Sequence, residues 1–131
     1  MAQRDILIVD DDRQVRDVLH QIFLASGYNC LLANDGREGL ALFRTARPPL
    51  TVTDLKMPGM TGIELLQGIR EDDADAAVIV LTGAADVKTA IDSLKLGAYD
   101  FIIKPVNVDE LLIAADRALE HRQLVLERRE Y

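Results

Sequence analysis

ILIVDDD, residues 6–12, joins a short run of apolar residues directly to three aspartates. A run of this length that is apolar throughout is typical of a strand covered on both faces, as in a parallel sheet. Three similar runs each end at a polar residue: residues 50–53 before Asp54, 78–81 before Thr82, and 99–103 before Lys104. Residues 28–33 form a weaker run, so the sequence predicts five strands.

Between these runs, apolar residues recur at the spacing of amphipathic helices. Five segments show this spacing, at Val15, Val18, Leu19, Ile22 and Phe23; Leu40 and Phe43; Ile63, Leu65, Leu66 and Ile69; Val87, Ala90, Ile91 and Leu94; and Leu111, Leu112, Ala115, Ala118 and Leu119. Five strands alternating with five helices predict βαβ units with right-handed crossovers. The fold class is therefore α/β, a doubly wound parallel sheet.

The composition restricts the functions that the chain can have. Its 131 residues suit one domain, and 49% of them are hydrophobic, as in globular proteins. The net charge of −7 disfavours a nucleic-acid surface, because phosphate contacts need clustered cations. No apolar run approaches the length of a membrane span, and the start of the chain lacks the pattern of a signal peptide. We therefore expect a cytoplasmic protein without membrane contact.

The polar residues that follow the strands are the candidate functional residues. In an open α/β sheet the carboxyl ends of the strands form the ligand site, so Asp10, Asp11, Asp54, Thr82 and Lys104 should lie close together. Clustered carboxylates repel one another, and Mg²⁺, which prefers oxygen ligands beside phosphate, offsets that repulsion. A lysine and a hydroxyl can bind phosphoryl oxygens. These residue types together indicate phosphoryl transfer onto an aspartate.

Four segments in this order resemble the receiver domains of two-component response regulators: ILIVDDD at 6–12, TDLKMPGMTG at 53–62, VIVLTG at 78–83 and GAYDFIIKPV at 97–106. The resemblance runs from about residue 4 to about residue 120. It implies the flavodoxin-like fold with strand order 2-1-3-4-5. It also implies a phosphorylation-activated switch that acts on no separate metabolite.

The resemblance assigns the metal and phosphoryl sites residue by residue. Asp54 corresponds to the phosphoacceptor, which also contacts the metal. Asp11 corresponds to a direct Mg²⁺ ligand, and Asp10 to an acid that reaches the metal through water. The backbone carbonyl of Lys56 corresponds to a third protein ligand. The implied cofactor is Mg²⁺, with Mn²⁺ able to substitute.

Three further positions correspond to residues that respond to phosphorylation. Lys104 and Thr82 match the catalytic lysine and the switch hydroxyl of the family. Phe101 matches the aromatic residue that turns inward on activation, although an apolar residue in a strand is also an ordinary core residue. The Lys104–Pro105 bond corresponds to one that is cis in the family.

The family also supplies the expected partners. A sensor histidine kinase or a phosphotransfer protein donates the phosphoryl group, and the surface of the fourth helix, fifth strand and fifth helix then changes shape. A homodimer through that surface, or through the C-terminal helix, is a further expectation. We expect no direct contact between this domain and nucleic acid.

The end of the chain predicts a helix longer than the domain needs, because no glycine or proline follows Val108. We divide the chain into a receiver domain, residues 1–121, and a helical extension, residues 122–131, that connects to an output domain. Leu112, Leu119 and Leu126 are spaced by seven, which suggests a coiled-coil seam, while a solvated helix end explains the same pattern.

Two other functions fit parts of the pattern. Asp10 and Asp12 form the DxD of haloacid-dehalogenase-like phosphatases, but Gln14 stands where that family has Thr or Val, and no acidic pair follows Lys104 on a further strand. Asp12 also suits a helix N-cap.

The second alternative is a phosphorylation-independent interaction module with the same fold. The intact set of Asp54, Asp11, Thr82 and Lys104 argues against it.

Overall fold

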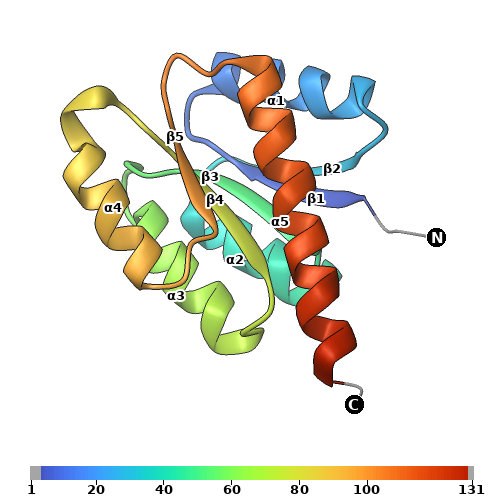
Figure 1. Ribbon diagram of the computed structural model, residues 1–131. Helices are drawn as coiled ribbons and strands as arrows, with labels where there is room; N and C mark the ends of the chain where they lie inside the picture. The colour runs from blue at the N-terminus through green and yellow to red at the C-terminus, as the bar shows by residue number, and fades with distance from the viewer. Residues whose placement is uncertain (1–3, 130–131) are drawn as a thin grey trace.

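A five-stranded parallel sheet forms the centre of the computed structural model, which describes residues 4–129 (Figure 1). The strands are β1 (Asp5–Val9), β2 (Asn29–Ala33), β3 (Leu50–Asp54), β4 (Ala77–Thr82) and β5 (Asp100–Ile103). They lie in the order β2-β1-β3-β4-β5, and every neighbouring pair is parallel. The predicted fold class and strand order are confirmed.

Helices cover both faces of the sheet, because successive strand side chains point to opposite faces. The helices are α1 (Arg13–Ala25), α2 (Gly36–Ala46), α3 (Gly62–Asp72), α4 (Val87–Lys95) and α5 (Val108–Arg129), with a short 3-10 turn, η1 (Ala84–Asp86), before α4. Ile6 and Ile8 pack with α1 and α5, whereas Leu7 and Val9 pack with α2 and α3 on the other face (Figure 1). The two apolar layers hold the carboxyl ends of the strands at one edge.

Two strands begin one residue later than the sequence predicts, and in both cases an aromatic residue precedes the strand. Tyr28 is buried, its ring packs edge-on against Phe23 at 5.0 Å, and its hydroxyl donates to Asp116 at 3.1 Å. Tyr99 packs against His121 of α5, with ring centroids 5.6 Å apart. Both tyrosines pack helices against the sheet. Aromatic residues are also common within strands, so the sequence alone counted both tyrosines as strand residues.

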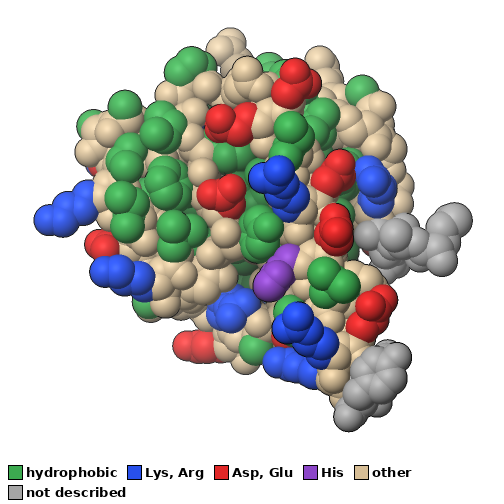
Figure 2. Space-filling view, viewed as in Figure 1, with side chains coloured by type: hydrophobic (Ala, Val, Ile, Leu, Met, Phe, Trp, Pro, Cys, Tyr) green, Lys and Arg blue, Asp and Glu red, His purple; other side chains and the backbone are tan. Residues whose placement is uncertain are grey.

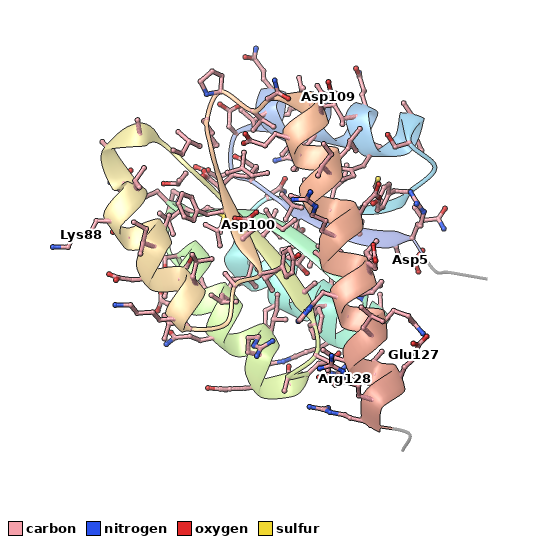
Figure 3. The ribbon with its side chains drawn as sticks, in the orientation of Figure 1. Asp5, Lys88, Asp100, Asp109, Glu127 and Arg128 are labelled. Carbon is pink, nitrogen blue, oxygen red and sulfur yellow. The ribbon has the colours of Figure 1, made fainter. Side chains whose placement is uncertain are left out.

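The helix α5 runs without interruption through the predicted boundary at residue 121 (Figure 3). Asp109 lies in its first turn and Arg128 in its last, which suits the helix dipole at both ends. Leu112 and Leu119 pack against the core of the domain, so the proposed coiled-coil seam is wrong for these two leucines. None of the described helices combines the length and the apolar character that crossing a bilayer requires.

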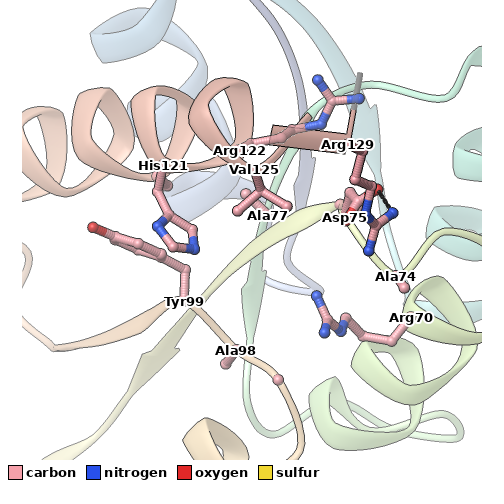
Figure 4. A pocket seen from close by; sticks show the side chains of 13 residues that line it. Arg70, Ala74, Asp75, Ala77, Ala98, Tyr99, His121, Arg122, Val125 and Arg129 are labelled. Atoms are coloured by element: carbon pink, nitrogen blue, oxygen red, sulfur yellow. Dashed lines mark hydrogen bonds and ion pairs between the residues drawn. The ribbon is translucent and has the colours of Figure 1, made fainter. Parts of the chain in front are cut away.

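The second half of α5 contacts the edge of the sheet opposite the strand carboxyl ends. Arg122, Val125 and Arg129 line a pocket of about 410 Å³ there, together with Ala77 at the start of β4. Arg129 also forms an ion pair with Asp75, in the loop before β4 (Figure 4). The described part of the predicted extension therefore lies against the domain.

Candidate functional site

The carboxyl edge of the sheet brings together polar side chains from four strand ends. Asp10 follows β1, Asp54 ends β3, Thr82 ends β4 and Lys104 follows β5. Strand register keeps the last three at one level, since Asp54 is paired with Leu81, and the Lys104 N–H donates to the Thr82 carbonyl at 2.7 Å. The predicted convergence of these residues is confirmed.

Three carboxylates form an acidic cluster. Asp10, Asp11 and Asp54 each offer an oxygen, and these oxygens lie within 4.8 Å of one another. Asp10 is fully buried, and its Oδ2 has no hydrogen-bond partner among the described residues, while Asp11 is exposed. An unsatisfied buried carboxylate oxygen beside two further oxygen ligands fits a divalent cation such as Mg²⁺.

Lys104 neutralises part of this negative charge. Its Nζ lies 3.1 Å from Asp54 Oδ1 and 3.6 Å from Asp10 Oδ2, the second distance being too long for an ordinary hydrogen bond. Burial acts to lower the pKa of Lys104, but the hydrogen bond and charge of Asp54, together with the charge of Asp10, outweigh it and raise that pKa. Burial, with repulsion from Asp54, raises the pKa of Asp10 although the Asp12 N–H opposes this. Because the pKa of Lys104 is raised, its ammonium group is charged at neutral pH.

The two predicted switch residues lie at different depths. Thr82 is 1% exposed, and its hydroxyl donates to the neighbouring Gly83 carbonyl at 3.1 Å. Phe101 is half-buried and packs against the apolar layer beneath α3 and α4. The Lys104–Pro105 bond is cis, as the resemblance implies.

The side chain of Lys56 does not join the acidic cluster. It is 76% exposed and forms an ion pair with Asp86, with Nζ 2.9 Å from Oδ1. The role of the Lys56 backbone carbonyl as a metal ligand stays a prediction. Sequence reasoning missed Asp86, because an acid at the start of a helix is common and nothing marks this one as a partner of Lys56.

Gly62 is a second residue whose part in the site the sequence did not reveal. It reads as a loop residue, yet it is the first residue of α3 and donates its N–H to the Leu55 carbonyl at 2.9 Å. A Cβ at this position would lie 2.3 Å from the Asp54 carbonyl oxygen and 2.9 Å from Leu55 Cα. Only glycine allows α3 to start so close to the end of β3.

Asp12 caps α1. Its carboxylate accepts the N–H groups of Gln14 at 2.9 Å and Val15 at 3.3 Å. Satisfying the free N–H groups of a first helical turn is an ordinary structural role for aspartate. The Asp10–Asp12 pair thus gives no support to the phosphatase alternative.

The strand order and the pocket of three carboxylates and one lysine at the carboxyl edge define a receiver-like α/β domain. The chain belongs to the response regulator receiver domain family, whose model matches residues 6–116. The chain is 41% identical over 128 residues to the C4-dicarboxylate transport transcriptional regulatory protein DctD of Pseudomonas aeruginosa, covering 98% of this chain and 28% of that protein. The chain spans about a quarter of the length of such curated relatives.

Solved structures agree with this assignment. The structure of NtrX from Brucella abortus superposes with a TM-score of 0.92 at 33% identity, covering 98% of this chain and 29% of that one. A response regulator receiver domain protein from Clostridium thermocellum gives a TM-score of 0.90 at 32% identity, covering 92% and 98% of the two chains. Two of the longer relatives, DctD of Pseudomonas aeruginosa and ZraR of Escherichia coli O157:H7, are named as transcriptional regulatory proteins.

Proposed function

We propose that this domain is a phosphorylation-activated switch of a two-component system that accepts a phosphoryl group on Asp54. The observation that carries the proposal is the pairing of Asp54 with Lys104 at 3.1 Å inside a cluster that includes Asp10 and Asp11. A lone surface aspartate would not need a partly buried lysine and two further acids. Membership of the receiver family supports the same assignment.

The acidic cluster is suited to Mg²⁺, with Mn²⁺ as a substitute. Asp11 and Asp54 would bind the cation directly, Asp10 through water, and the Lys56 carbonyl would complete the protein ligands. A bound divalent cation would neutralise the carboxylates and the oxygens of the incoming phosphoryl group. Asp10 Oδ2 is buried and has no hydrogen-bond partner among the described residues, and a metal-bound water would supply one, which supports this arrangement.

The side chains of the domain divide the chemistry among them. A carboxylate oxygen of Asp54 attacks phosphorus, and the bond between phosphorus and the donor's histidine nitrogen breaks as the new P–O bond forms. Lys104 holds the Asp54 carboxylate and then a phosphoryl oxygen. Thr82 leaves the Gly83 carbonyl to donate to another phosphoryl oxygen, and Phe101 turns inward. The surface formed by α4, β5 and α5 changes shape as a result.

An apolar groove beside the site suits a helical phosphodonor. Val15, Val18 and Leu19 of α1 line it opposite Pro105 and Val106, with a volume of about 630 Å³. Val18 is 56% exposed, although helical spacing placed it on the apolar side of α1. Because Lys104 also borders the groove, a helix bound there would present its side chains to Asp54. A sensor histidine kinase or a phosphotransfer protein is the partner that we propose.

The output side of the switch is the surface of α4, β5 and α5. Figure 2 shows apolar side chains gathered over α4, where Ile91 and Leu94 of the helix and Leu96 directly after it are each 39–46% exposed. This surface, or the C-terminal helix, would form a homodimer. We propose that residues 1–121 are the receiver unit and residues 122–131 the connector, of which residues 130–131 lie outside the described structure. The proposed location is the cytoplasm.

Mass spectrometry of the intact protein tests the proposal. Incubation with Mg²⁺ and acetyl phosphate should add the mass of one phosphoryl group. Asp54→Asn should abolish the gain, because the amide cannot act as the nucleophile. Asp116→Asn, a charge-matched change on α5, should leave it intact. A phosphoryl group that persists in Asp54→Asn, or never forms with any donor or kinase, would refute the assignment.

A further inference from the structure

The ion pair between Lys56 and Asp86 joins the two loops that border the proposed phosphorylation site. Lys56 lies two residues beyond Asp54, in the loop after β3. Asp86 lies four residues beyond Thr82, at the end of η1 and directly before α4. Their side chains are 76% and 25% exposed, so the pair lies at the surface and can exchange partners.

The carboxylate of Asp86 is not used to cap α4. An aspartate at the N-cap normally accepts an N–H of the first helical turn. Asp86 occupies this position but makes no side-chain cap hydrogen bond, and its Oδ1 binds Lys56 instead. Only Ala90 and Ser93 of α4 are buried, so little apolar packing holds this helix in place. Contacts at its start therefore have a large influence on its position.

A second contact holds the same loop. The Gly83 carbonyl accepts the hydroxyl of Thr82 at 3.1 Å and the N–H of Asp86 at 3.0 Å. Residues 83–86 are thus fixed by Thr82 at one end and by Lys56 at the other. The Thr82 hydroxyl and the Lys56 ammonium group are both hydrogen-bond donors that a phosphoryl group on Asp54 would attract.

We propose that Lys56 is shared between Asp86 and the phosphoryl group on Asp54, so that phosphorylation breaks the ion pair and frees the start of α4. Two residues of chain span at most about 7 Å, and lysine has a flexible four-carbon stem, so Nζ can reach either partner. A phosphoryl group carries close to two negative charges at neutral pH against one on Asp86. The released carboxylate is then free to cap α4. Asp86 is a positioning residue that acts through Lys56 and the start of α4. This inference rests on the proposed function.

A double-mutant cycle tests the sharing of Lys56. The measured quantity is the affinity for beryllofluoride, a tetrahedral analogue of the phosphoryl group, in the presence of Mg²⁺. Asp86→Asn should tighten binding about two- to five-fold, the factor that an exposed ion pair supplies, because Lys56 no longer has a competing partner. In the Lys56→Gln background, Asp86→Asn should have no further effect.

Two controls separate this mechanism from a general charge effect. Asp92→Asn removes the same charge from an exposed position on α4 and should leave the affinity unchanged. Amide exchange at residues 87–90 should change on Asp86→Asn, while the thermal midpoint stays within a few degrees. Equal tightening with and without Lys56 would overturn the inference alone. A wild-type protein that gains no mass with acetyl phosphate would overturn the proposed function and this inference together.

Discussion

Replacing Gly62 by alanine should destabilise the domain far more than the same change at Gly83. The added Cβ of Gly62→Ala would lie 2.3 Å from the Asp54 carbonyl oxygen, about 1 Å inside an ordinary carbon–oxygen contact. The obstructing atoms are backbone, so the start of α3 and the end of β3 must separate. The shift would also strain the hydrogen bond from the Gly62 N–H to the Leu55 carbonyl.

The expected loss is about 3 kcal/mol of unfolding free energy, at the upper end of the cost of inserting a methyl group into a packed site. For a chain of 131 residues the unfolding entropy is about 0.28 kcal/mol per kelvin, so the thermal midpoint should fall by about 10 °C. Urea unfolding and calorimetry measure both quantities.

Gly83→Ala is the matched control. Its φ of −75° suits any residue, and the nearest atom to its added Cβ is 4.0 Å away. Alanine should therefore leave stability within about 1 kcal/mol of wild type, on the stabilising side, because it restricts the unfolded chain. Neutral surface changes alter unfolding free energies by roughly 0.5 kcal/mol. If Gly62→Ala and Gly83→Ala differ in unfolding free energy by less than this, the close approach of α3 to β3 is refuted.

Three further predictions concern the acidic cluster, the cap of α1 and an interior tyrosine. Mg²⁺ at ten times its dissociation constant should stabilise the domain by about 1.4 kcal/mol, or roughly 5 °C, in a thermal shift assay. Asp11→Asn should remove most of this gain, and an undiminished shift would exclude Asp11 as a ligand. Asp12→Ala should cost about 1 kcal/mol in urea unfolding, because the first turn of α1 loses its cap, and an unchanged midpoint would contradict that role. Burial, together with the charge and hydrogen bond of Asp116, raises the pKa of Tyr28 to about 12, despite the opposing charge of Arg4. The folded state holds the Tyr28 hydroxyl proton more tightly than the unfolded chain does, and this difference stabilises the folded protein. The stabilisation is complete below pH 10, about the unfolded pKa, and is lost as pH rises to about 12. Tyr28→Phe should show a shallower fall of stability across that interval, and parallel curves would argue against the shifted pKa.

The sequence predicted the parts of the site that strand topology alone determines. Asp10, Asp54, Thr82 and Lys104 each follow a run of apolar residues, and parallel strands bring their carboxyl ends to one edge whatever the details of the loops. Membership of the receiver family and the cis Lys104–Pro105 bond followed from the same motifs.

Features that depend on contacts between loops and helices were not predictable in this way. The Lys56–Asp86 pair joins two loops whose relative position no periodicity reports. The spacing of Leu112 and Leu119 is the same whether leucines face a second helix or their own sheet, and in this domain they face the sheet. Distinguishing these outcomes requires knowing which surfaces the other elements have already covered.

The uninterrupted course of α5 gives the domain a lever arm. Its 22 residues extend about 33 Å, from the turn beside Lys104 to the opposite edge of the sheet. A tilt of about 5° at the first turn would displace the last turn by roughly 3 Å. One ion pair, between an exposed Arg129 and a largely buried Asp75, and a few side chains restrain that far end, so slight repacking near the aspartates becomes a displacement on the scale of an atomic diameter.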